Sequence, residues 1–283
     1  MFFGRGLVST SEDFGLQGAL PSHTKLLDWL SYQFVDSGWN VKQLLKTIVL
    51  SATYRQNSNP SQDLLREDPE NILLARGSAL RLPAEMIRDS ALFASGLLVE
   101  SSGGPPVKPY QPDGLWKEKS GSVYQRELGE GSHRRSLYTY WKRTSPPPAM
   151  MTLDASNREV CVVRRQVTMT PLQILVLLND PQYVEAARAL AQEAMLAQDG
   201  LEEQLNFLFR KLITRTPSEA ECRVLASLYA DQREAFAANG EAVDQLLAIG
   251  DHPVDDQVDT LALAAMTVVA EGLMTYDETV MKR

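Results

Sequence analysis

The feature that most constrains the fold is a series of stretches in which apolar residues recur every three or four positions, the spacing of one helix face. Several follow residues that commonly begin helices. Thr170-Pro171-Leu172-Gln173 has the residues of a capping box with proline in the first helical position, and Asp180-Pro181 begins the next stretch. The pattern predicts helices at 22–36, 41–52 (capped by Asn40), 83–98, 172–178, from 181 onward, 201–213, 217–237, 241–249 and 257–275.

Three details of this helical pattern involve particular residues. Asp68-Pro69 has the residues of a further helix start. The helix at 172–178 is nearly all apolar, so we expect it to be buried on every side. Thr216-Pro217-Ser218-Glu219 has the spacing of a second capping box, which would begin the helix at 217–237.

The middle of the chain, at about 105–170, interrupts the helical pattern with prolines and glycines. Val123-Tyr124 and Ser136–Trp141 contain strand-forming residues and are expected to pair across a turn, and Glu159–Arg165 is expected to form another short strand. The fold class that follows is mainly α: a multi-helix globular domain with a central irregular or short-β insertion. We expect a single domain over 1–283, helical at 1–104 and at 171–283.

Charge is unevenly placed along the chain. The 283 residues have a net charge of −8, and 44% are hydrophobic, which is ordinary for a soluble globular protein. Residues 151–283 carry 11 Lys and Arg against 21 Asp and Glu, whereas 134–165 hold seven basic residues against Asp154 and Glu159. A basic island in an acidic protein indicates local anion binding, and ion pairs within the fold are the alternative explanation.

Several chemistries leave no pattern in the sequence. Cys161 and Cys222 match no metal or haem spacing, so we expect two buried small side chains, with a disulfide as the alternative. His23 is expected to cap a helix or to form a hydrogen bond rather than to bind a metal. The acid-rich loop 251–256 is expected to cap a helix rather than to hold a cation. We therefore expect no metal and no cofactor in this chain.

Targeting and catalytic motifs are equally sparse. The first 20 residues lack the pattern of a signal peptide, and no apolar stretch reaches the length of a membrane span. The sequence has no GxSxG, HExxH, Walker A or GxGxxG motif before a helix. The sequence therefore leaves enzymatic activity uncertain and favours a non-catalytic protein.

Several longer motifs resemble one bacterial family. They include FGRGLV at 3–8, IVLSATYRQ at 48–56, GGPPVKPYQP at 103–112, RRSLYTYWKRTSPPP at 134–148 and TPLQILVLLNDP at 170–181. REVCVVRR, which ends at Arg165, and the closing DET belong to the same set. Together they span nearly the whole chain, which resembles the domain of unknown function 1553 family, common in planctomycetes.

The resemblance implies a setting but no reaction. Such domains usually close a longer exported polypeptide, after a domain of unknown function 1549 and often a planctomycete-type cytochrome c. The family pattern extends before Met1, so the chain is expected to be the C-terminal part of a longer protein. A periplasmic or cell-surface location and contact with the upstream domains are implied in the same way.

The favoured function is a recognition or assembly module of such an exported protein. Arginine forks suit sulfate and carboxylate groups and aromatic rings stack on sugar faces, so an acidic polysaccharide is the expected ligand. The resemblance also implies that such proteins often occur together with sulfatases, which agrees with this ligand. The predicted ligand-binding residues are Arg134, Arg135, Tyr138, Tyr140, Trp141, Lys142, Arg143, Arg158, Arg164 and Arg165.

Two alternatives remain open. Asp154 and Glu159 are candidates for the paired carboxylates of a polysaccharide-acting enzyme. The acidic C-terminal third is a candidate docking surface for a basic cytochrome c. Binding to nucleic acid is not expected, because the chain as a whole is acidic.

Overall fold

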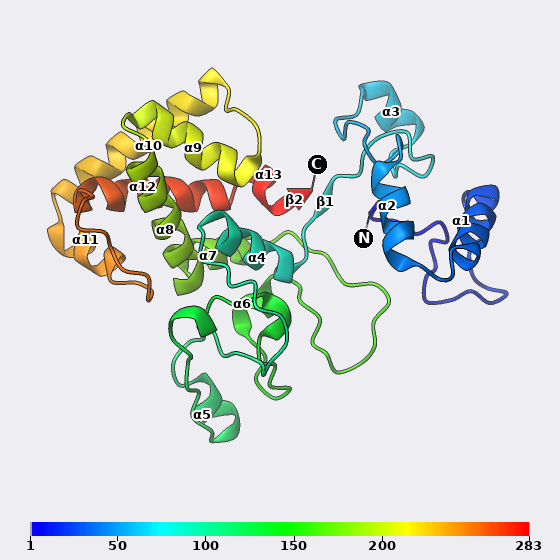
Figure 1. Cartoon of the computed structure of the whole chain (residues 1–283), viewed down its shortest axis with the longest axis horizontal. Coiled ribbons are helices and arrows are strands. Elements are labelled where there is room, and N and C mark those ends of the chain that lie inside the picture. Colours follow the sequence, from blue (N-terminus) through cyan, green and yellow to red (C-terminus); the bar gives the residue numbers. More distant parts are fainter. Residues whose placement is uncertain (1, 283) are drawn as a thin grey trace. The chain divides into compact units, whose positions relative to one another are not determined.

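The computed structural model describes residues 2–282 and is mainly α-helical (Figure 1). Contacts divide the chain into two compact units. The first runs up to Arg81 and includes Val162–Arg164 and the residues from Met281, and the second comprises Leu82–Cys161 and Arg165–Val280. Among the described residues, no helix is long and apolar enough to span a membrane.

The second unit is built around two packed helices, α8 (Pro181–Ala197) and α12 (Thr260–Met274). Each buries a row of alanines, and such small side chains let the two backbones approach closely. Around this pair lie α4 (Ala84–Ala94), α7 (Pro171–Asn179), α9 (Leu201–Ile213), α10 (Glu219–Ala237) and α11 (Gly240–Leu247), with the short helices α5 (Leu115–Ser120), α6 (Pro148–Thr152) and α13 (Asp277–Val280) in the same unit.

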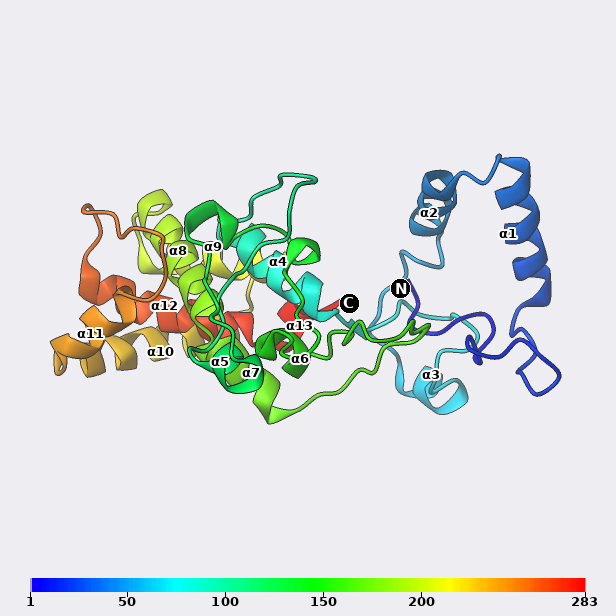
Figure 2. The same ribbon diagram turned by 90° about the horizontal axis from the view of Figure 1, so that it is seen from below.

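The first unit contains α1 (Thr24–Asp36), α2 (Val41–Leu50) and α3 (Gln62–Glu67). Helices α1 and α2 lie side by side in both views (Figures 1 and 2). The rings of Phe2 and Phe3 pack edge-on against Tyr54, and the ammonium of Lys282 lies 3.8 Å from the centroid of that ring. Strands β1 (Leu80–Arg81) and β2 (Met281–Lys282) pair antiparallel, so the unit joins residues from both ends of the chain.

Helix starts follow the predicted residues in most places. Asn40 accepts a hydrogen bond from the backbone of the third residue along, as an N-cap does, and Asp180 does the same from the second. The side chain of Gln173 accepts from the amide of Thr170 at 3.1 Å, which is one half of the predicted capping box.

Two predicted helix starts are wrong. The Asp68 carboxylate accepts from the amides of Ile72 and Leu73 at 2.7 and 2.8 Å, so it closes a turn instead of beginning a helix. The capping box of α10 is formed by Ser218 and Glu221, two residues after the predicted one. In both places a local carboxylate satisfies backbone amides, but the amides are not the ones that the spacing indicated.

The prediction that 172–178 is buried on every side is wrong. Leu172 is 64% exposed, and Ile174 and Leu175 are about half exposed, while Gln173 and Leu177 are buried. Helix α7 packs on α8, α12 and α6 with one face only. Its other face keeps apolar side chains in solvent, which periodicity alone does not foresee.

The predicted hairpin at Val123-Tyr124 and Ser136–Trp141 is wrong. Ser136–Tyr138 forms a 3₁₀ turn, and the backbone of Val107, not of residue 123 or 124, exchanges hydrogen bonds with Tyr138 and Tyr140 at 2.8 and 2.7 Å. The expected strand at Glu159–Arg165 does not form either. The described part of 105–170 is therefore an irregular insertion held mostly by side chains.

Both cysteines have free thiols, so the alternative of a disulfide does not hold. Cys161 is exposed and Cys222 is half-buried, so the expectation of two buried cysteines is wrong. Cys161 lies in the exposed segment that was predicted to be a strand, where there is no sheet to cover it.

Candidate functional site

A buried arginine of α4 anchors the insertion. Arg88 is 1% exposed, and its guanidinium donates to the carbonyls of Ser132 at 2.6 Å and Arg134 at 2.7 Å and to the amide oxygen of Gln182 at 2.7 Å. A buried guanidinium needs acceptors on every side, and the loop together with Gln182 of α8 provides them. Arg88 therefore fixes the path of the backbone at 132–136.

Arg134 and Tyr138, two of the predicted ligand-binding residues, contact the neighbouring loop at 101–105. Arg134 is 9% exposed and donates to the carbonyls of Ser101 and Pro105, each at 3.1 Å, and of Gly103. Its guanidinium stacks on the Tyr138 ring with 4.0 Å between the guanidinium carbon and the ring centroid. Both side chains thus hold the loop at 101–105.

Glu185 of α8 joins the 132–136 loop to two further loops. It is 0% exposed, and its two oxygens accept from the Tyr110 hydroxyl at 3.0 Å, His133 Nε2 at 3.1 Å, and the amides of Asp251 and His252 at 2.6 and 2.8 Å. Burial by itself would raise the pKa of Glu185, but the hydrogen bonds, led by the one from His133, outweigh burial and lower it. The carboxylate therefore stays charged at the meeting point of these loops.

The acidic loop 251–256 also contributes to this framework. Asp251 accepts two hydrogen bonds from the Arg126 guanidinium, each at 2.8 Å, and that guanidinium stacks on the Tyr110 ring at 4.2 Å. The expectation that the acids of 251–256 cap a helix is wrong for Asp251, and it is Asp259 that caps α12. Among the described residues, no group of three or more His, Cys, Asp and Glu is placed to hold a metal ion.

From Tyr140 to Arg143, successive side chains belong alternately to two different clusters. Tyr140 and Lys142 meet the ring of Trp116, which is 6% exposed. The ammonium groups of Lys142 and Lys108 lie 4.2 and 5.8 Å from its centroid, and Tyr124 packs edge-on against it at 4.9 Å. We call Lys108, Trp116, Tyr124, Tyr140 and Lys142 the inner cluster.

The intervening residues form a more exposed group, which we call the outer cluster: Trp141, Arg143, Asn157, Arg158 and Glu159. The Trp141 indole donates to the Asn157 carbonyl at 2.9 Å, and the Arg158 guanidinium lies 4.8 Å from the centroid of the Trp141 ring. The Arg143 side chain is 82% exposed, and its Nε is 3.9 Å from the Glu159 carboxylate. The outer cluster therefore presents one guanidinium group over an aromatic ring and a second, exposed guanidinium group near Glu159.

The other predicted basic residues lie elsewhere. Arg165 pairs with Glu85 at 2.6 Å and Arg135 lies 3.8 Å from Asp89. Arg164 is exposed and belongs to the first unit. The basic residues of the island are thus divided: some contact groups within the fold, Arg143 and Arg158 belong to the exposed outer cluster, and Arg164 lies exposed in the first unit.

The two candidate catalytic carboxylates have different surroundings. Asp154 has a φ of 63°, in the left-handed region, and its carboxylate accepts from the Thr168 amide at 2.7 Å and the Gln173 side chain at 3.2 Å. Asp154 therefore closes the loop that leads back to α7. Glu159 is half exposed beside Arg143 in the outer cluster.

Sequence reasoning did not single out Lys108 and Trp116. Lys108 stands in the GGPPVKPYQP motif, which was used only for the family resemblance, and both residues lie more than 20 positions before Tyr140. One sequence signal could have found them: a lysine and a tryptophan stand in a stretch rich in glycine and proline. Such stretches form loops, and loops often carry binding residues. Their meeting with Tyr140 depends on the parallel bridge between Val107 and Thr139, which no local pattern indicates.

The chain is thus a mainly α-helical protein. Its irregular insertion is anchored by side chains and places cations beside aromatic rings. The family model described as "PSD1: Protein of unknown function (DUF1553)" matches residues 1–229, and the chain belongs to this family. No curated protein and no solved structure matches the chain significantly.

Proposed function

We propose that the chain is a recognition module that binds the acidic groups of a polysaccharide through the outer cluster. The observation that carries the proposal is the Arg158 guanidinium above the Trp141 ring, together with the exposed Arg143, whose nearby carboxylate belongs to Glu159, the residue next to Arg158. A planar guanidinium forms two parallel hydrogen bonds with a sulfate or a carboxylate, and an indole face packs against a sugar ring.

The surroundings of these arginines favour exchange with a ligand. Among the residues that the structure describes, the carboxylate near Arg143 belongs to Glu159; the Arg143 side chain is largely in solvent and the Glu159 side chain is half exposed. Exposed ion pairs at such distances contribute about 0–1 kcal/mol, so an incoming sulfate would displace Glu159 at little cost. Arg134, with three carbonyl acceptors and a stacked tyrosine, has no such freedom.

The test compares dextran sulfate, polygalacturonate and neutral dextran as immobilised ligands. We expect salt-sensitive retention on the two anionic polymers, because screening weakens contacts between exposed charges. The double substitution Arg143→Gln and Arg158→Gln should weaken binding about tenfold or more, since each charge-assisted hydrogen bond contributes about 1.5–3 kcal/mol.

A matched control removes two positive charges elsewhere. Arg223 and Arg233 are exposed on α10, and changing both to Gln alters the net charge equally. Retention should survive in this variant. Equal losses in the two double variants would mean that only net charge matters, and the outer cluster would then not be the site.

The finer setting of this function rests on the resemblance. An exported multidomain protein, a periplasmic or surface location and contact with upstream domains all agree with a module that holds polymer for other domains. Docking to a cytochrome c stays a prediction from the acidic C-terminal third. Catalysis by Asp154 and Glu159 has less support, because the Asp154 carboxylate is already used by Thr168 and Gln173.

A further inference from the structure

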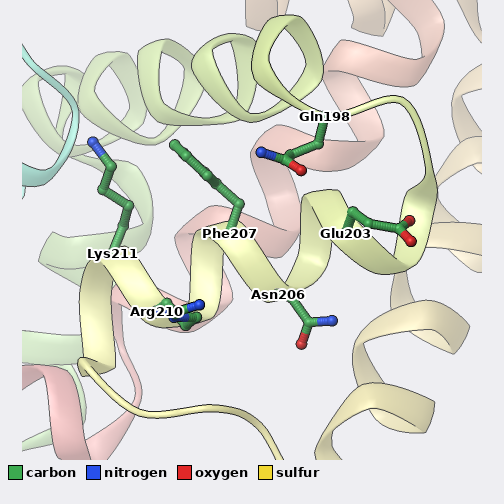
Figure 3. A pocket seen from close by; sticks show the side chains of 6 residues that line it. All are labelled: Gln198, Glu203, Asn206, Phe207, Arg210 and Lys211. Atoms are coloured by element: carbon green, nitrogen blue, oxygen red, sulfur yellow. The ribbon is translucent and has the colours of Figure 1, made fainter.

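A pocket of about 450 Å³ lies on the second unit, and none of its lining residues belongs to either cluster (Figure 3). Helix α9 provides most of its lining and the end of α8 provides the rest. The lining side chains are Gln198, Glu203, Asn206, Phe207, Arg210 and Lys211.

Phe207 is unexpected on this face of α9. The helix buries Leu205, Leu208, Phe209 and Ile213, so its remaining positions face outward and are otherwise mostly polar. An aromatic ring among polar side chains at the wall of a pocket is a stacking surface for a flat ligand.

One face of the Phe207 ring is already in use. The ammonium of Lys211 lies 5.2 Å from the ring centroid and is held there by Glu193 at 2.8 Å. Figure 3 shows Lys211 on one side of Phe207 and Gln198 on the other, with the Gln198 amide directed toward the ring. The space between Phe207 and Gln198 is therefore the place for a ligand.

The polar side chains of the pocket have spare hydrogen-bonding capacity. Within the described part of the chain, the side-chain amides of Gln198 and Asn206 make no hydrogen bond, and Arg210 makes no ion pair. An amide both donates and accepts, which suits hydroxyl groups. The Arg210 guanidinium suits one carboxylate or sulfate.

We infer that this pocket binds a single sugar ring that carries an acidic group. The ring face packs on Phe207, the hydroxyls bond to Gln198 and Asn206, and the acid pairs with Arg210. An aromatic acid would leave both amides without partners, and a neutral sugar would leave Arg210 without one. The inference shares its ligand class with the proposed function and rests on it in that respect, but the residues are different.

Two such sites on one module would bind a polymer more strongly than either site binds a monomer. When one site is occupied, the second acts at a high effective concentration of the same chain. The outer cluster would then serve a repeated acid group, and the pocket a single ring within the polymer or at its end.

The experiment uses the full chain and glucuronic acid, followed by saturation-transfer NMR and calorimetric titration. Phe207→Leu removes the stacking face and Arg210→Gln removes the acid contact, and each should weaken glucuronic acid binding about tenfold. Phe207→Tyr keeps a ring and should retain binding. Thermal melts of all variants exclude unfolding as the cause of a loss.

Glucose and inorganic sulfate separate the two parts of the ligand. Both should bind at least about tenfold more weakly than glucuronic acid, because each lacks one set of contacts. Equal binding of glucose would overturn the acidic class. Unchanged glucuronic acid binding in Phe207→Leu and Arg210→Gln, or no binding to the unaltered chain, would overturn the pocket as the site.

The Arg143→Gln, Arg158→Gln variant distinguishes this inference from the proposed function. It should bind glucuronic acid normally while it loses retention on dextran sulfate. If glucuronic acid binding disappears only in that variant, the outer cluster is the sugar site and the pocket inference fails. If polymer retention is unaffected in that variant while the pocket variants lose the monosaccharide, the proposed function fails and the pocket stands.

Discussion

The two compact units of the chain use their apolar residues differently. In the second unit, Leu190, Leu208, Leu263 and Met266 are all 0% exposed, within a core that joins α8, α9 and α12. Among the described residues of the first unit no apolar side chain is buried, and Trp29 of α1 is 48% exposed. The same helical spacing of apolar residues therefore leads to a core in one unit and to exposed stripes in the other.

The difference shows that amphipathic spacing and burial are separate properties. Spacing decides which side chains share a helix face, whereas burial needs a second surface that covers that face. The first unit has instead a buried polar turn, in which Arg76 donates to the carbonyls of Asp68 and Pro69, each at 2.8 Å. Its stability should depend less on apolar contacts than that of the second unit.

The largest effect is expected from Arg88→Leu in the second unit. The substitution leaves the carbonyls of Ser132 and Arg134 and the side chain of Gln182 without their buried donor. Each unsatisfied buried acceptor costs about 1–3 kcal/mol, so the free energy of unfolding should fall by about 3–5 kcal/mol in urea titrations.

Arg66→Leu in the first unit is the matched control. The Arg66 side chain is 79% exposed and its carboxylate neighbour is 3.9 Å away, so the change should stay within about 0.5 kcal/mol. Similar losses in the two variants would show that the units do not differ in this way.

A smaller effect, of opposite sign, is expected from Glu271→Gln in α12. Burial raises the pKa of Glu271 to about 7, and its Oε1 has no hydrogen-bond partner among the residues that the structure describes. Because the folded pKa is above the unfolded value of about 4.3, stability is lost as the pH rises from there through about 7.

The substitution should therefore raise the free energy of unfolding at pH 8 by about 1–3 kcal/mol and leave it nearly unchanged below pH 4. Urea titrations across this pH range measure the difference between the two proteins. A parallel pH dependence in both would contradict the assignment, and the core of the second unit would then hold the charged carboxylate without penalty.

Helix positions were largely predictable because their signals are local. A proline or a capping side chain acts within one turn, and the starts at Asn40, Thr170 and Asp180 depend on nothing distant. The burial of α7 and the paths of the loops were not predictable, because they depend on contacts with elements that are distant in the sequence. Arg88 and the loop that it anchors are more than 40 residues apart.

The candidate site was predictable only as a region. The sequence indicated the basic and aromatic composition of 134–165, but composition is the same for an arginine that faces inward and one that faces outward. Arg134 and Arg143 are nine residues apart, yet the first faces inward and the second outward, because the first donates to carbonyls of 101–105 whereas, in the described part of the chain, the second pairs only loosely with Glu159. Such partners become visible only when the loops are placed.

Apart from the Arg66→Leu control, the smallest effect is expected from Leu45→Ala in α2, with Leu208→Ala in α9 as its counterpart. Leu45 is 37% exposed and Leu208 is 0% exposed. A buried leucine loses about 2–5 kcal/mol when truncated, whereas a partly exposed one loses about 1 kcal/mol or less. Hydrogen exchange followed peptide by peptide measures both, because it reports the opening of α2 and α9 separately. A loss at Leu45 as large as that at Leu208 would mean that the apolar stripe on α2 is covered in solution. The contrast between the units would then depend on the surface that covers this stripe, and not on a difference in how each unit is built.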